Sequence, residues 1–128
     1  MIYVHIVIAL ALIEFFLFGW AVGRARGRYS VSAPAVTGNE MFERYLRVQM
    51  NTLEQLVIFL PAVFLFARYV SPIIAAGLGA LFIVGRAIYF RAYVQDPKKR
   101  TFGFALTAFP NIALLIGGLL GALRALIG

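Results

Sequence analysis

Three polar side chains interrupt an apolar segment that spans residues 47 to 69. Arg47, Asn51 and Glu54 are four and three positions apart, so on an α-helix they share one face. A guanidinium, an amide and a carboxylate on one face can bind a small ligand that carries both carboxylate and ammonium groups. The spacing is also compatible with polar contacts between helices. The stripe therefore predicts either a wet pocket or an interhelical contact at one end of an apolar helix.

A second stripe of the same kind is formed by Arg86, Tyr89 and Tyr93, again at helical spacing. Two interpretations stay open. In the first, the stripes line a pocket with several cations and one carboxylate, which suits a ligand with more negative than positive charge. In the second, Arg86 pairs with Glu54 and the tyrosines form an aromatic belt at the membrane surface.

The composition indicates that the helices carrying these stripes lie in a membrane. Of the 128 residues, 62% are hydrophobic and 13% are charged, whereas soluble domains average about 45–50% and about 25%. Four apolar segments, at about 2–22, 47–69, 72–93 and 102–127, are each long enough to cross ~30 Å of hydrocarbon. None alternates as a membrane β-strand would. The sequence predicts an all-α, integral membrane four-helix bundle with residues 1–128 in a single domain.

Several other classes are disfavoured. The first segment lacks a basic start and contains Glu14, so we expect a retained helix rather than a signal peptide. Glu14 itself is expected to be a structural contact between helices or protomers. With no cysteine and one histidine, no metal site is expected. The basic residues flank apolar segments, so nucleic acid is not an expected partner.

The basic residues also predict an orientation. They gather in two predicted loops, at about 23–46 and 94–101, which lie on the same side of a four-helix chain. The positive-inside rule places these loops in the cytoplasm and both termini on the opposite side. The basic residues in the two loops are Arg24, Arg26, Arg28, Arg44, Lys98, Lys99 and Arg100.

Two longer stretches carry a resemblance to a known family. FERYLRVQMNTLE (42–54), followed by GRAIYFRAY (85–93) and a basic loop that ends in Arg100, resembles the MAPEG family of membrane-associated proteins in eicosanoid and glutathione metabolism. The resemblance covers nearly the whole chain. It implies a homotrimer in the membrane lipid, with glutathione bound at the cytoplasmic end between neighbouring protomers.

The resemblance also implies residue roles. Arg100 is expected to point at the glutathione thiol and stabilise the thiolate, with Tyr93 as the assisting hydroxyl and Tyr89 equally compatible by spacing. A lipophilic substrate is expected to enter from the bilayer, along a groove between the first and fourth helices of adjacent protomers, lined by Phe104, Thr107 and Phe109. The glutathione-binding residues implied are Arg26, Arg47, Gln49, Asn51, Glu54, Tyr89, Tyr93 and Arg100.

Glutathione-dependent transferase or peroxidase chemistry is the favoured function, and the sequence leaves conjugation, peroxidation and isomerisation open. One alternative is a non-catalytic member of the family that binds lipid or glutathione. The presence of Arg100 and the other polar residues favours the enzyme. A second alternative is a small transporter or channel component, which is disfavoured because the polar stripes lie at one end of the membrane and do not cross it.

Overall fold

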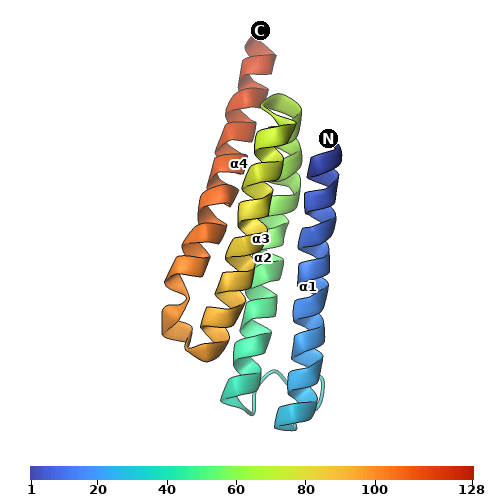
Figure 1. The fold of residues 1–128 in the computed structure, drawn as a ribbon, viewed down its shortest axis with the longest axis vertical. Helices are drawn as coiled ribbons and strands as arrows, with labels where there is room; N and C mark the ends of the chain where they lie inside the picture. Colours follow the sequence, from blue (N-terminus) through green and yellow to red (C-terminus); the bar gives the residue numbers. More distant parts are fainter.

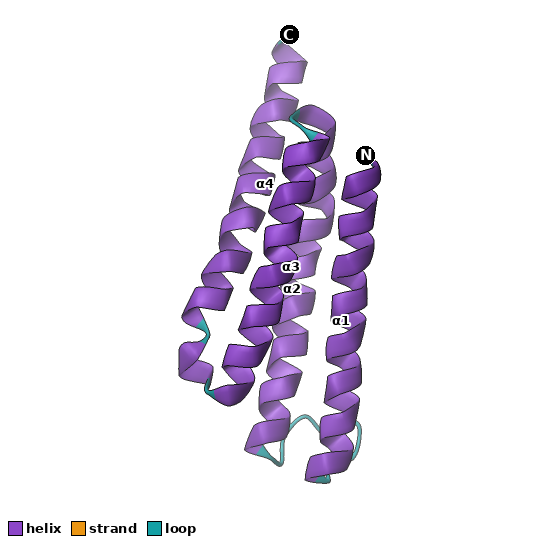
Figure 2. Cartoon of the chain, viewed as in Figure 1, coloured by secondary structure: helices purple, strands orange, loops and turns teal.

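In a computed structural model that describes residues 1–128, the chain forms four long helices and no strand (Figures 1 and 2). All four are long and apolar enough to cross a membrane, which confirms the predicted all-α membrane bundle. The elements are α1 (Ile2–Tyr29), α2 (Glu40–Tyr69), α3 (Pro72–Gln95), the short 3-10 helix η1 (Pro97–Lys99) and α4 (Thr101–Ile127).

The predicted loop at 23–46 is wrong in extent, because helix occupies most of it. α1 continues seven residues past Val22, and α2 begins seven residues before Arg47. The apolar run marked the part of each helix in contact with lipid, but the helices end at capping residues. Ser30 closes α1 in the left-handed conformation, with φ 58°. The Asn39 side chain starts α2 by accepting a hydrogen bond from the backbone N–H of Phe42 at 3.0 Å.

The four helices are arranged so that α2 and α3 lie between α1 on one side and α4 on the other (Figure 1). The loop at residues 30–39 and the connection through η1 lie at the same end of the bundle, which we call the loop end. The two chain termini and the α2–α3 turn lie at the other end (Figure 1). This is the arrangement expected from an even number of spans.

The main apolar core lies toward the end with the termini, where all four helices contribute side chains. Phe59 of α2 stacks on Phe82 of α3, with ring centroids 4.1 Å apart and planes at 9°. The outer surface is also apolar: Phe16 is 76% exposed and Ile73 is 73% exposed. In a membrane this surface faces hydrocarbon, so most polar side chains lie in the bundle interior and toward the two ends of the bundle.

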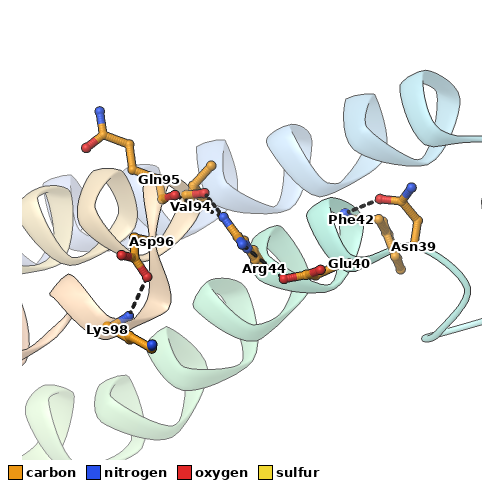
Figure 3. A network of polar contacts seen from close by, with 8 residues as sticks. All are labelled: Asn39, Glu40, Phe42, Arg44, Val94, Gln95, Asp96 and Lys98. Atoms are coloured by element: carbon orange, nitrogen blue, oxygen red, sulfur yellow. Dashed lines mark hydrogen bonds and ion pairs between the residues drawn. The ribbon is translucent and has the colours of Figure 1, made fainter.

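At the loop end, Arg44 joins the start of α2 to the end of α3 (Figure 3). Its Nη1 donates to the backbone carbonyls of Val94 at 2.9 Å and Gln95 at 3.0 Å. Its Nη2 pairs with Glu40 at 3.0 Å, one turn earlier on α2. The last carbonyls of α3 have no partner within the helix, so a cation there satisfies them and complements the helix dipole.

Replacing Arg44 with alanine is therefore expected to lower the free energy of unfolding by about 1–3 kcal/mol, because two hydrogen bonds from a charged donor are lost. Thermal unfolding in detergent measures the change. Arg91→Ala is the matched control, since Arg91 is exposed near the same end of α3. Equal melting temperatures for the two variants would show that Arg44 does not clamp the helices.

Candidate functional site

The predicted α2 stripe lies on the half of the helix nearer the loop end. Arg47 and Glu54 are exposed, and Asn51 between them is half-buried. The Asn51 Oδ1 atom is buried and has no hydrogen-bond partner within the chain. Buried amide oxygens are rarely left unpaired in folded proteins. The stripe thus presents a cation and a carboxylate to a ligand or a neighbouring molecule, with a half-buried amide between them.

The α3 stripe places its two tyrosines beside the start of α4. The rings of Tyr89 and Tyr93 lie 5.6 Å apart, and Tyr89 also contacts the ring of Phe104 at 6.3 Å. Tyr89 is 4% exposed, and Tyr93 is half-buried. The close approach of α4 requires Gly103, because a Cβ there would lie 2.5 Å from the backbone nitrogen of Tyr89.

Cations from separate elements lie within electrostatic range of Tyr89. Arg47 of α2 and Arg100, which directly precedes α4, lie close enough for their charges to act on the Tyr89 hydroxyl. Arg86, one turn back on α3, lies with its guanidinium 4.3 Å from the centre of the Tyr89 ring. The Arg100 side chain is exposed and donates to the carbonyl of Pro97 at 3.0 Å. This concentration of positive charge beside two phenols favours an anion, such as a thiolate or a carboxylate.

Arg86 is not paired with Glu54, so that part of the interhelical interpretation is wrong. Arg86 is completely buried, and it donates to the hydroxyls of Thr52 at 2.7 Å and Thr107 at 3.4 Å. The reason is the direction of the side chains: Arg86 points into the bundle, whereas Glu54 is exposed on the outside of α2. Arg86 therefore joins three helices below the tyrosines.

Two predicted glutathione-binding residues lie apart from the others. Gln49 faces α1, where its Nε2 lies 3.0 Å from the position that a Cβ of Gly19 would take, and it lines a cavity of about 370 Å³. Arg26 donates to the carbonyl of Ala35 at 2.8 Å and lies over the ring of Phe42. Within one protomer the predicted glutathione-binding residues therefore form two groups. One group lies near Tyr89 and consists of Arg47, Tyr89, Tyr93 and Arg100, whereas Gln49 and Arg26 lie on the α1 side.

The predicted lipophilic groove is partly corrected. Phe104 and Phe109 are exposed on α4, as residues that meet a substrate from the bilayer must be. Thr107 is completely buried and bonded to Arg86, so its assignment to the groove surface is wrong. Thr107 belongs to the buried face of α4, which follows three-and-four spacing through Gly103, Thr107, Asn111 and Leu114 and leaves Phe104 outside.

A cavity of about 640 Å³ lies at the loop end of α1 and contains none of the predicted site residues. Its walls are Trp20, Ala21, Arg24, Ala25, Gly27, Arg28, Tyr29 and Tyr45. Arg24 lies over Trp20 with its guanidinium 5.1 Å from the ring. Trp20 is the amphipathic aromatic type found at membrane–water interfaces.

The sequence also left some polar residues of the bundle interior unassigned. Asn111 of α4 donates from Nδ2 to the Oε1 of Gln55 at 3.0 Å and to the Gln55 carbonyl at 3.3 Å. Thr52 was likewise not singled out. The available signal was the presence of polar residues inside apolar segments, which in membranes indicates partners within the bundle.

Comparison with known proteins now gives this geometry a family context. The MAPEG family model matches residues 4–120. An uncharacterized protein of Synechocystis sp. is 50% identical over 118 residues, which cover 92% of this chain and 86% of that protein. Microsomal glutathione S-transferase 2 of Homo sapiens is 42% identical over 83% of this chain and 70% of its own length, and that of Mus musculus is 40% identical over 77% and 70%.

The family match covers all four helices and the residues gathered at the loop end. It agrees with the resemblance carried by the two sequence stretches, and the four apolar helices agree with its membrane setting. This chain is an integral, multi-pass membrane protein that belongs to the MAPEG family.

Proposed function

We propose that this protein is a membrane-embedded glutathione transferase or peroxidase that holds the glutathione thiol as a thiolate. The observation that carries the proposal is the gathering of Arg47, Arg86 and Arg100 around Tyr89 at the loop end. The relatives named microsomal glutathione S-transferase 2 support it.

The charges of the site are complementary to those of glutathione, which carries two carboxylates, one ammonium group and a thiol. Arg47 and Arg100 supply cations for the carboxylates and the sulfur. Glu54 is exposed on the same face of α2 as Arg47 and Asn51, so its carboxylate is available for the ammonium group. The half-buried amide of Asn51 lies between Arg47 and Glu54 and is the proposed hydrogen-bond partner of the tripeptide backbone.

Thiol activation follows from elementary electrostatics. A free thiol has a pKa near ~8.5, so only a small fraction is thiolate at neutral pH. A cation beside the sulfur stabilises the thiolate, and each unit by which the pKa falls corresponds to about 1.36 kcal/mol. Arg100 is the proposed cation. We assign the hydrogen bond to the thiolate to Tyr89 rather than to Tyr93, the residue chosen from the sequence, because the Tyr89 ring is held between Arg86 and Phe104.

The chemistry of the second substrate divides into two balanced reactions. In conjugation, the sulfur forms a bond to an electrophilic carbon, and the leaving group departs with the displaced electron pair. In peroxidation, the thiolate attacks the terminal oxygen of a hydroperoxide, the O–O bond breaks, and the alkoxide takes up a proton and leaves as the alcohol. The glutathione sulfenic acid formed in this step then reacts with a second glutathione to give the disulfide and water. Phe104 and Phe109 are exposed on α4 and are the proposed contacts of the apolar substrate.

In the proposed homotrimer, predicted glutathione-binding residues that lie apart in one protomer come from two neighbouring protomers and form one pocket. Gln49 and the stripe of Arg47 and Asn51 lie on different faces of α2, so a neighbouring copy that offers its Gln49 and Arg26 face can complete the pocket. The same arrangement places the groove between α1 and α4 of adjacent copies, because these helices lie on opposite sides of the protomer (Figure 1). The loop end, which carries most of the basic residues, is proposed to face the cytoplasm.

The deciding experiment is isothermal titration calorimetry of glutathione into detergent-purified protein, with the ultraviolet thiolate absorbance recorded on the same sample. We expect binding together with a thiolate signal at neutral pH. S-methylglutathione is the matched ligand control, because it keeps both carboxylates and the ammonium group but has no ionisable thiol; it should bind without the signal. Tyr89→Phe should weaken the signal more than Tyr93→Phe does.

Other outcomes would point elsewhere. Glutathione binding without a thiolate signal would support a non-catalytic member that binds glutathione. An absence of binding at millimolar glutathione would contradict the proposal and leave a lipid-binding protein as the better account.

A further inference from the structure

The buried guanidinium of Arg86 lacks a charged partner among its hydrogen bonds. Thr52 donates its own hydroxyl proton to the carbonyl of Val48 at 2.7 Å, and Thr107 donates to the carbonyl of Gly103 at 3.1 Å. Both hydroxyls therefore accept from Arg86 with their lone pairs. The Arg86 Nε atom is buried with no hydrogen-bond partner. A cation inside a membrane bundle commonly pairs with an opposite charge, with backbone carbonyls or with water in a cavity.

One carboxyl group lies on the inner side of α1. The buried residues of this helix are Val4, Val7, Ala11, Phe18, Val22 and Ala25. Their spacing follows the three-and-four pattern of a single helix face, and position 14 is the step between 11 and 18. That position holds Glu14, which is half-buried. Glu14 therefore belongs to the face that packs against the other helices rather than to the face that meets lipid.

The register of α1 against α3 brings Glu14 to the level of Arg86. The two helices run in the same direction (Figure 1). Val7 lies against Gly79, and Phe18 stacks on Phe90 with centroids 4.7 Å apart. Each of these pairs is separated by 72 positions in the sequence, and so are Glu14 and Arg86. The same offset therefore places Glu14 at the level of Arg86 on the neighbouring helix, although the two side chains do not form a direct ion pair.

We infer that Glu14 is the counter-charge of Arg86, and that Arg86 is a positioning residue for Tyr89 at the glutathione thiol. The second half of this inference rests on the function proposed above. We define the Arg86 cluster as Glu14, Thr52, Arg86 and Thr107, one side chain from each of the four helices. The cluster fixes the guanidinium 4.3 Å from the Tyr89 ring.

The cluster has two consequences for the site. The hydrogen bonds to Thr52 and Thr107 fix the position of the Arg86 guanidinium, which in turn holds the Tyr89 ring packed against it in one place. The charge of Arg86 also contributes to the potential at the thiol, because Arg86 lies against the Tyr89 ring and Glu14 is not among the groups that act on Tyr89. The other groups that face Tyr89 contribute as well. These are Arg47 of α2, Tyr93 of α3 and Arg100 at the start of α4. Loss of the Arg86 charge should therefore make the bound thiol harder to ionise.

The counter-charge is tested by a double-mutant cycle of thermal unfolding in detergent, with Glu14→Gln, Arg86→Gln and the double variant Glu14→Gln/Arg86→Gln. Arg86→Gln leaves a carboxyl without its partner, so its melting temperature should fall sharply. The double variant should melt at a higher temperature than Arg86→Gln alone, because neither charge is left uncompensated. Additive losses would overturn the pairing of Glu14 with Arg86.

The positioning role is tested by titrating the thiolate absorbance of bound glutathione against pH. Wild type is compared with Arg86→Lys and with the double variant Glu14→Gln/Arg86→Gln, which remains available if Arg86→Gln alone does not fold. Arg86→Lys keeps the charge, so its titration midpoint should stay near that of wild type. The double variant loses the Arg86 charge and the hold on Tyr89, so its midpoint should rise by roughly half a pH unit or more. A midpoint equal to that of wild type in the double variant would overturn the positioning role.

The two measurements separate this inference from the proposed function. The unfolding cycle needs no glutathione, so it judges the pairing even if the protein binds none. If the wild type binds glutathione without forming a thiolate, the proposed thiol activation is wrong, and so is the positioning role of Arg86. A double-mutant cycle with non-additive changes in melting temperature would still support the pairing of Glu14 with Arg86.

Discussion

Arg100→Ala is expected to lower kcat/KM for the conjugation of glutathione to chlorodinitrobenzene by about 10²–10³-fold, the usual cost of removing one group that stabilises developing or resident negative charge. The pKa of the bound thiol should move up toward its free value of ~8.5, because the cation that favours the thiolate is gone. Raising the pH should therefore recover part of the lost activity, since more of the thiol is then ionised. The pH profile of kcat/KM measures both effects.

Lys99→Ala is the matched control for this variant. Lys99 is an exposed cation one position before Arg100, but its charge is not among those that act on Tyr89. Its removal should leave the profile in place. Fold loss is not expected in Arg100→Ala, because that side chain is exposed and bonded only to the carbonyl of Pro97. An unshifted pH profile in Arg100→Ala would show that another group activates the thiol.

Gly103→Ala is expected to have the largest effect on the fold at the site. The new Cβ would lie 2.5 Å from the backbone nitrogen and 2.6 Å from the Cα of Tyr89, and a backbone cannot move aside as a flexible side chain can. The helices α3 and α4 must separate, at a cost of about 1–3 kcal/mol or more. The separation would also move Arg100 away from Tyr89, so activity should fall together with the melting temperature.

Gly77→Ala provides a control with the opposite sign. No atom lies within 4 Å of a Cβ at Gly77, and alanine in a helix interior is favoured over glycine by roughly 0.5–1 kcal/mol. Its melting temperature should hold or rise. A Gly103→Ala variant as stable and as active as Gly77→Ala would mean that α3 and α4 do not depend on this close approach.

The membrane bundle was predictable because its signals are local. Runs of apolar residues fixed the number of helices, and the helical spacing of Arg47, Asn51 and Glu54 placed them on one face before any packing was known. The stretches at 42–54 and 85–93 also identified the family, which the match over residues 4–120 confirms.

Other parts of the site depend on how the helices face one another, which spacing within one helix does not reveal. The partners of Arg86 could not be predicted, because Glu54 and Thr52 are near neighbours on α2 that point to different sides. Thr107 was assigned to the groove for the lipophilic substrate for the same reason. The ends of α1 and α2 were missed because capping by Ser30 and Asn39, rather than the loss of apolar residues, ends these helices.

The division of polar residues between two faces of α2 also constrains the symmetry of any assembly. An isologous dimer interface brings the same patch of each copy together, so it would set Arg47 against Arg47 and leave Gln49 facing α1 in both copies. Joining unlike faces requires a heterologous, head-to-tail contact, which leaves one free donor face and one free acceptor face at every step. Only a closed ring of chains leaves no unpaired interface in such an assembly. In that ring each chain contributes to two pockets, and the number of pockets equals the number of chains.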